Sequence, residues 1–104
     1  MRLKTHIRAG ALLRRAQGLG LFGAVLRKGD PDGGVLFVLV RSGALVRLFV
    51  EDGASDGQAF VARTDGFAPP AEAEEILRRE AEFDRDLWVV EIEGEGAEAL
   101  LTEG

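Results

Sequence analysis

Four aspartates, placed as two pairs in two short turns, are the residues of this chain best suited to chemistry. Asp30 and Asp32 form one pair, Asp84 and Asp86 the other, and a single residue separates the carboxylates of each pair. Carboxylate oxygens bind hard cations, and a carboxylate pair can do acid–base work when burial or the neighbouring charge raises one pKa. If both turns lay at the same end of a sheet, the four carboxylates would converge and a metal site would be favoured.

Each turn also has a purely structural interpretation. Residues 30–33 read Asp-Pro-Asp-Gly, the order typical of a type I turn, in which the first carboxylate accepts a hydrogen bond from the turn backbone. Residues 84–86 end a predicted helix, and Trp88 would anchor the following strand in the core. The first turn lacks the later acidic ligands of a calcium loop. We therefore favour the structural interpretation and assign no metal.

Basic residues supply two candidate anion-binding groups. Arg27 and Lys28 precede the Gly-rich first turn, whose N–H groups could help to hold a phosphate, although no P-loop sequence is present. A basic stripe on the N-terminal helix could instead bind nucleic-acid phosphates. It consists of Arg2, Lys4, Arg8, Arg14 and Arg15. The net charge is −5 and no aromatic residue interleaves with these bases to stack on nucleobases. Nucleic acid is therefore not an expected partner and stays an alternative hypothesis.

Most familiar catalytic groups are missing. The chain has no cysteine and one histidine, His6, which excludes a thiolate nucleophile, a disulfide and a Cys- or His-clustered metal site within one chain. Its serines are Ser42 and Ser55, and neither lies in the Gly-x-Ser-x-Gly pattern of a nucleophile elbow. We expect His6 to be an ordinary residue on the helix surface, and we assign no catalytic residue and no cofactor.

Composition predicts one small domain in the cytoplasm. The chain has 104 residues, of which 46% are hydrophobic and 30% charged, typical of a globular domain with a modest core. Its longest apolar run, Val35–Val40, is far too short to span a bilayer. Residues 1–50 hold nine basic residues against two acidic ones, and residues 51–104 hold four against sixteen. This asymmetry could mark a basic surface, but we favour the interpretation that the two halves neutralise each other in the fold.

The chain pattern predicts an α+β fold. We expect an N-terminal helix from Thr5 to about Gln17, a four-stranded antiparallel meander, a second helix and a final strand, with the helices packed mainly on one face of the sheet. The strands are expected over residues 21–28, 35–41, 44–51, 58–63 and 87–92, and the second helix over 69–83. Residues 35–41 are apolar at nearly every position, which favours a central strand covered on both faces. The domain is expected to span residues 1–93, followed by a frayed acidic, Gly-rich tail over 94–104, in which Ala97 to Leu101 could form one helical turn.

The leading functional hypothesis, a protein-interaction module, rests on the number of apolar residues in the predicted strands. The strands over 35–41, 44–51 and 87–92 offer more apolar positions than two short helices can cover. An exposed apolar face or an unpaired edge strand commonly marks an interface. We therefore expect a non-catalytic protein-interaction module that forms a homo-oligomer or binds another protein. We do not expect it to bind a membrane. A small metal- or phosphate-binding enzyme using the acidic turns is the alternative from a different class.

Three stretches of the chain resemble a known family. They are Ala11–Arg15, Arg27–Leu36 and Phe83–Glu91, and the similarity spans Leu3 to Glu93. In this order they resemble the small bacterial family catalogued as domain of unknown function 1491. The family usually has Asp-Pro-Asp before Leu-Trp, where this chain has Arg85 in place of proline. The resemblance implies a fold and a size but no activity, because the family has none assigned.

Overall fold

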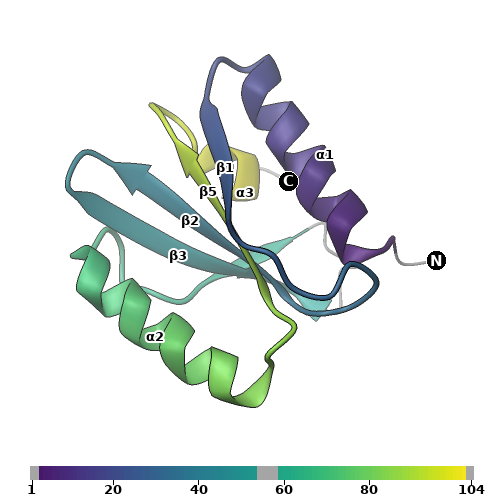
Figure 1. Cartoon of the computed structure of the whole chain (residues 1–104). Coiled ribbons are helices and arrows are strands. Elements are labelled where there is room, and N and C mark those ends of the chain that lie inside the picture. The colour runs from purple at the N-terminus through teal and green to yellow at the C-terminus, as the bar shows by residue number, and fades with distance from the viewer. Residues whose placement is uncertain (1–2, 54–58, 103–104) are drawn as a thin grey trace.

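The computed structural model describes residues 3–53 and 59–102, and its α+β class agrees with the expectation from sequence. Within these residues three helices accompany one five-stranded mixed sheet (Figure 1). In chain order the elements are α1 (Thr5–Gly18), β1 (Phe22–Arg27), β2 (Leu36–Ser42), β3 (Leu45–Glu51), β4 (Phe60–Ala62), α2 (Pro70–Phe83), β5 (Trp88–Glu93) and α3 (Ala99–Thr102). None of the described helices is long and apolar enough to cross a membrane.

The last strand lies inside the sheet, which corrects the predicted four-stranded meander. The spatial order is β1-β5-β2-β3-β4, with β5 antiparallel to β1 and parallel to β2. Only β2, β3 and β4 form an antiparallel meander. The physical reason is burial: Trp88, Val89, Val90 and Ile92 are all buried, so β5 needs neighbours on both edges and cover on both faces. The eight-residue link over 28–35 is long enough to let β1 and β2 separate.

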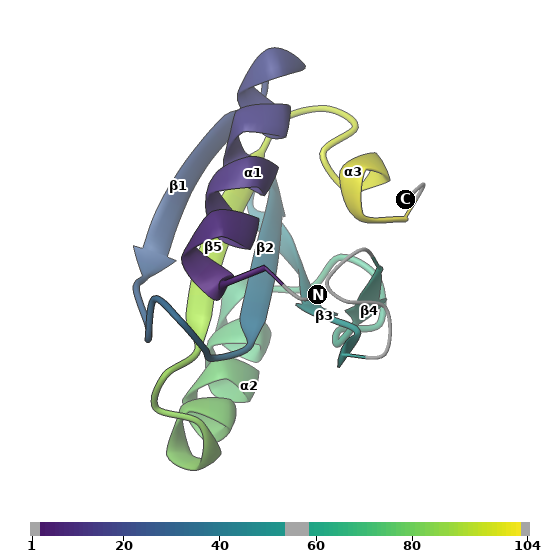
Figure 2. The same ribbon diagram turned by 90° about the vertical axis from the view of Figure 1, so that its right-hand side faces the viewer.

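Helices cover both faces of the sheet, so the expectation of helices mainly on one face is wrong. Side chains alternate along β2: Leu36, Val38 and Val40 join the cluster that contains α1 and α3 residues, whereas Phe37 and Leu39 join the cluster under α2. Figures 1 and 2 show α1 and α2 on opposite sides of the sheet. The predicted central position of this strand is correct, and a strand that is apolar on both faces requires the two-sided cover.

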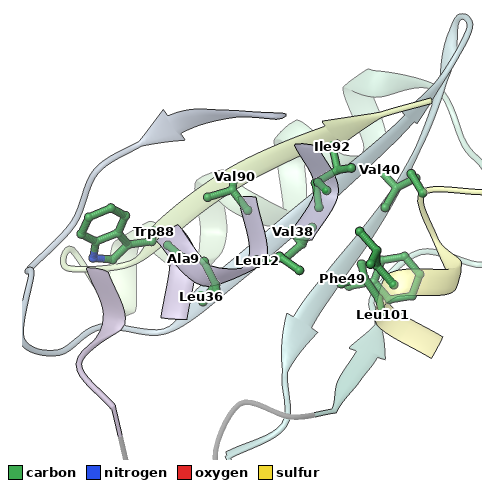
Figure 3. Packing of buried hydrophobic residues seen from close by; sticks show 13 residues of the cluster. Ala9, Leu12, Leu36, Val38, Val40, Phe49, Trp88, Val90, Ile92 and Leu101 are labelled. Carbon is green, nitrogen blue, oxygen red and sulfur yellow. The ribbon is translucent and has the colours of Figure 1, made fainter. Parts of the chain in front are cut away.

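The segment expected to be a frayed tail is part of the core as far as Thr102. Ala97, Leu100 and Leu101 are buried and belong to the same cluster as α1 (Figure 3). Their spacing of three and four residues is that of one helical face. Leu101 of α3 lies beside Phe49 in the same cluster. Apolar residues at helical spacing therefore outweighed the acidic, Gly-rich composition. Residues 103 and 104 lie outside the described part of the chain.

Candidate functional site

The two acidic turns lie side by side, as the metal hypothesis required. The N–H of Asp30 donates to the carbonyl of Asp86 at 3.1 Å, and the indole N–H of Trp88 donates to the carbonyl of Asp30 at 2.7 Å. The cause is the parallel pairing of β2 with β5, because parallel strands begin at the same end of a sheet and each turn precedes one of them. We call residues 29–34 and 84–86 the acidic junction.

Two of the four aspartate carboxylates in the acidic junction accept hydrogen bonds from backbone N–H groups. Asp30 Oδ1 accepts from the N–H of Asp32 at 3.1 Å, and Asp84 Oδ1 accepts from the N–H of Asp86 at 3.0 Å. Both are the local turn contact that aspartate commonly makes with the backbone two residues on. Asp84 Oδ2 also accepts from the N–H of Val35 at 3.3 Å, so one carboxylate links the two turns.

No group of three or more His, Cys, Asp or Glu side chains within residues 3–53 and 59–102 is placed to hold a metal ion. The turns therefore meet through their backbones rather than by gathering their four carboxylates around one point. Asp32 points instead toward Lys4, whose Nζ lies 3.4 Å from its carboxylate in an exposed ion pair. What this arrangement does chemically is provide protein acceptors for backbone N–H groups of exposed residues where two chain segments approach.

Two glycines make this approach possible. A Cβ on Gly29 would lie 1.9 Å from the carbonyl oxygen of Asp86, and a Cβ on Gly34 would lie 2.0 Å from the same atom. Gly34 also has a φ of +85°, which favours glycine. The sequence left open that Arg27, Lys28 and the N–H groups of this Gly-rich turn could hold a phosphate. In the structure, the carbonyl group of Asp86 in the second turn occupies the space beside Gly29 and Gly34.

A cleft of about 360 Å³ opens beside the acidic junction, at the start of α1. Thr5 and Arg8 line it from α1, Lys4 lines it from the position before the helix, and Asp32 and Asp84 line it from the turns. The Thr5 hydroxyl is not free to bind a ligand there, since it donates to the carbonyl of Gly34 at 2.9 Å. The cleft walls carry both signs of charge, and the volume lies at the lower end of the range for ligand pockets.

A buried ion pair behind this cleft was missed by sequence reasoning. Arg8 Nη2 lies 2.7 Å from Glu51 Oε1, and the two side chains are 9% and 1% exposed. Arg8 Nε donates to the second carboxylate oxygen at 2.9 Å, which makes the contact bidentate, and the N–H of Leu36 donates to Glu51 Oε1 at 3.1 Å. One available signal was strand alternation, because Glu51 lies two residues beyond the core residue Phe49 and therefore shares its face.

The predicted basic stripe is divided by the fold. Arg8 is used in the buried ion pair, Lys4 faces Asp32, and Arg14 and Arg15 are exposed on α1. Arg2 lies outside the described residues. Further pairs join the basic half of the chain to the acidic half, among them Arg41–Glu91 at 2.6 Å and Arg47–Glu98 at 2.7 Å. These contacts agree with the interpretation that the two halves neutralise each other.

The remaining predicted residues lie around the acidic junction. His6 is exposed, as expected, and its ring Nδ1 lies 2.9 Å from the carbonyl of Pro31. Arg27 donates to the carbonyl of Arg85 at 3.0 Å, so it joins the two turns, and Lys28 is exposed. The four basic residues proposed for anion binding form two separate pairs: Arg27 and Lys28 adjoin the acidic junction, whereas Arg14 and Arg15 belong to α1.

The edge strand β1 exposes large apolar side chains. Phe22 is 64% exposed, Val25 45% and Leu26 53%. Figure 2 shows β1 at the margin of the sheet, and no strand among residues 3–53 and 59–102 pairs with its outer side. We call residues 22–26 the β1 edge. The sequence pattern predicted surplus apolar surface but assigned it to the strands at 35–41, 44–51 and 87–92, which are central and largely buried.

These features define an α+β protein with a five-stranded mixed sheet, helices on both faces and two glycine-dependent turns joined at one end. Residues 3–102 match the family described as "Protein of unknown function (DUF1491)", and the chain belongs to this family. The resemblance inferred from three stretches of sequence is thereby confirmed.

Solved structures with the same fold include two family members from bacteria. A crystal structure of a DUF1491 family protein from Caulobacter crescentus CB15 is 33% identical, with a TM-score of 0.81 over 98% of this chain and 96% of that one. The solution structure of protein Atu0922 from A. tumefaciens is 35% identical, with a TM-score of 0.83 over 98% and 94% of the two chains. No curated protein matches this chain. The family has no assigned function, so function must be argued from the molecule itself.

Proposed function

We propose that this protein is a non-catalytic interaction module that self-associates. The observation that carries the proposal is the β1 edge, where Phe22, Val25 and Leu26 are between 45% and 64% exposed on a strand with one unpaired side. A row of unpaired N–H and C=O groups next to apolar side chains is a template for pairing with another strand. Burial of such side chains is the main favourable contribution to most associations.

The use of the polar residues supports a module over an enzyme. Asp30 and Asp84 accept backbone hydrogen bonds within the acidic junction, and Glu51 and Arg8 neutralise each other in the interior. A catalytic carboxylate needs access to a substrate proton, which the Glu51 side chain, 1% exposed, does not have. Asp30 and Asp84 bind turn backbone in the observed geometry. The absence of cysteine also supports our expectation that the protein works in the cytoplasm.

Self-association is tested by sedimentation velocity over a wide range of protein concentration. We expect the mass to shift from that of one chain to that of two as concentration rises, with a midpoint that marks the dissociation constant. A chain that stays monomeric at every concentration up to the millimolar range would refute the proposal.

The acidic-turn alternative has one observation in its favour, the cleft that Asp32, Asp84 and Lys4 line. It is tested by recording amide chemical shifts of the labelled protein during separate titrations with Mg²⁺, Ca²⁺ and inorganic phosphate. Saturable shifts confined to residues 29–35 and 84–86 would favour this alternative. We expect only the small, unsaturable shifts that added salt produces.

A further inference from the structure

We infer that the partner copy docks edge to edge: the β1 edge pairs antiparallel with the β1 edge of a second copy, and the two sheets become one. This inference rests on the proposed self-association and assigns it a surface and a geometry. A two-fold axis perpendicular to the sheet generates the arrangement, since it brings the same strand of both copies together in opposite directions. Backbone hydrogen bonds between the two strands would extend the sheet of each copy.

The β1 edge lacks most of the devices that keep edge strands apart. Residues 22–26 read Phe-Gly-Ala-Val-Leu, with no charged residue and no proline, although natural edges are commonly protected by a central lysine or a proline. One device is present, a bulge between Val25 and Arg27, which limits regular pairing to residues 22–25. The opposite edge, β4, is only three residues long, and a short edge offers a partner few backbone groups.

Charges at the two ends of β1 select this occupant and this direction. Arg27 and Lys28 are exposed at the end of the strand, and Glu93 is exposed beside its beginning, paired with Phe22. An antiparallel second copy places the partner's Arg27 and the partner's Lys28 at the end where Glu93 lies. A parallel copy would instead bring like charges together. The charge pattern is therefore complementary to itself after a two-fold rotation, as a self-associating surface requires.

The relevant side chains also lie on one face of the joined sheet. Residues opposite each other in an antiparallel pair point to the same face, so Phe22 shares a face with Glu93, and Arg27 shares a face with Val89. Val89 and its cluster lie on the α2 side, opposite Val90 and Ile92. Because Glu93 and Val89 alternate in phase along β5, Arg27 and Glu93 project on the α2 side. The partner's Arg27, which in its own chain donates to the Arg85 carbonyl, would then lie on the same face as the exposed Phe22 ring and Glu93.

The first experiment compares two matched valine variants by sedimentation velocity. Val25→Lys puts a charge in the middle of the β1 edge, and Val61→Lys puts the same charge on β4, where the valine is 51% exposed against 45% for Val25. We expect Val25→Lys to weaken association about tenfold or more, because a lysine would be desolvated beside the partner strand. Val61→Lys should leave association unchanged. Circular dichroism and thermal unfolding confirm that both variants fold.

The outcomes separate the inference from the proposed function. A wild-type chain that never dimerises removes both. A wild-type dimer that Val25→Lys and Phe22→Ser leave intact, or that Val61→Lys disrupts equally, overturns the β1 arrangement while self-association stands. Phe22→Ser serves as the second edge variant should Val25→Lys fail to fold, since Phe22 is 64% exposed.

The second experiment tests direction by exchanging charges. Arg27→Glu or Glu93→Arg alone should weaken the dimer roughly fivefold at low salt, since two equivalent pairs turn repulsive, and the effect should shrink in 0.5 M NaCl. The double variant carries both exchanges and should recover the wild-type dissociation constant. A double variant as weak as either single variant would refute the antiparallel arrangement.

A third readout uses the absence of cysteine in the native chain. Val25→Cys supplies one thiol on the β1 edge and Val61→Cys supplies one on β4. A short bis-maleimide should cross-link the Val25→Cys dimer efficiently and leave the Val61→Cys protein single. Equal cross-linking of the two variants would contradict edge-to-edge docking at β1.

Discussion

The acidic junction and the β1 edge are neighbours in the chain, yet they use their side chains in opposite ways. In the junction, the carboxylates of Asp30 and Asp84 accept backbone N–H groups. The carbonyl of Asp86 occupies the space beside Gly29 and Gly34. Along the edge, side chains that would suit a core are exposed, up to 64% for Phe22. The difference shows that the position of a strand or turn in the sheet decides the role of a residue, and residue type alone does not.

The largest expected effect tests how tightly the junction is closed. Gly34→Ala would put a Cβ 2.0 Å from the Asp86 carbonyl oxygen at a φ of +85°, so the two turns must separate. We expect a loss of about 4 kcal/mol or more in the free energy of unfolding, or no folded protein. Urea denaturation followed by circular dichroism measures it.

Gly43→Ala is the matched control for this prediction. Gly43 also has a positive φ, +60°, but its Cβ would meet nothing within 4 Å. Only the backbone cost of about 1–2 kcal/mol remains. If both variants lost the same stability, the contrast between a closed junction and an open surface would be wrong.

The next effect concerns the ion pair behind the junction. Glu51→Leu removes the carboxylate that Arg8 and the N–H of Leu36 share in the interior. Leaving a buried guanidinium without this partner should cost about 3–5 kcal/mol. The double variant with Arg8→Met should recover part of this loss, because no unpaired charge is left. A double variant that is less stable than Glu51→Leu would show that Arg8 stabilises the protein through its other contacts.

A smaller effect separates the aspartates of the junction from one another. Asp84→Ala removes the acceptor of two backbone N–H groups, those of Val35 and Asp86, and should cost about 2 kcal/mol. Asp32→Ala removes an ion pair whose side chains are 59% and 68% exposed, so the change should stay within about 0.5 kcal/mol. Thermal unfolding of the two variants under one condition provides the measurement. Equal losses would mean that Asp32 has a structural role comparable to that of Asp84.

Local sequence patterns predicted much of the fold because their causes are local. The helical spacing in α1 and the proline start of α2 each depend on residues close together in the chain, and both elements are present. The all-apolar pattern of β2 likewise predicted its central position. The two acidic turns were also located correctly, since Asp-Pro-Asp-Gly and the end of α2 act over a few residues.

The partners of these elements could not be predicted in the same way. Insertion of β5 between β1 and β2 joins Trp88 to Leu36, 52 positions apart in the sequence, and no local pattern distinguishes it from a strand added at an edge. That insertion is also what leaves β1 at the margin and brings the acidic turns together. The Arg8–Glu51 pair depends on the same long-range arrangement. Both candidate sites therefore follow from the strand order β1-β5-β2-β3-β4, for which the sequence pattern had wrongly predicted a four-stranded meander.

The smallest expected effect on stability concerns Glu75, a carboxylate outside the junction that serves as a comparison for the aspartates within it. Glu75, on the exposed side of α2, bonds Arg78 through Nη2 at 2.7 Å and Nε at 3.1 Å. This hydrogen bonding to Arg78, with the added charges of Arg78 and Arg79, lowers the pKa of Glu75 from its ordinary value of 4.5. A lowered folded-state pKa stabilises the protein above the unfolded pKa, and this contribution is lost as pH falls through the folded value.

Arg78→Gln should therefore raise the pKa of Glu75 toward its ordinary value and reduce the share of acid unfolding that this residue causes. Carboxyl NMR titration of Glu75 in the two proteins measures the shift, and unfolding midpoints between pH 7 and pH 3 measure its consequence. The change in midpoint should be the smallest of the series, because both side chains are about half exposed and solvent screens the pair. An effect as large as that of Asp84→Ala would mean that exposed ion pairs stabilise this protein as much as backbone acceptors in the junction do, and the contrast between the junction and the surface would then fail.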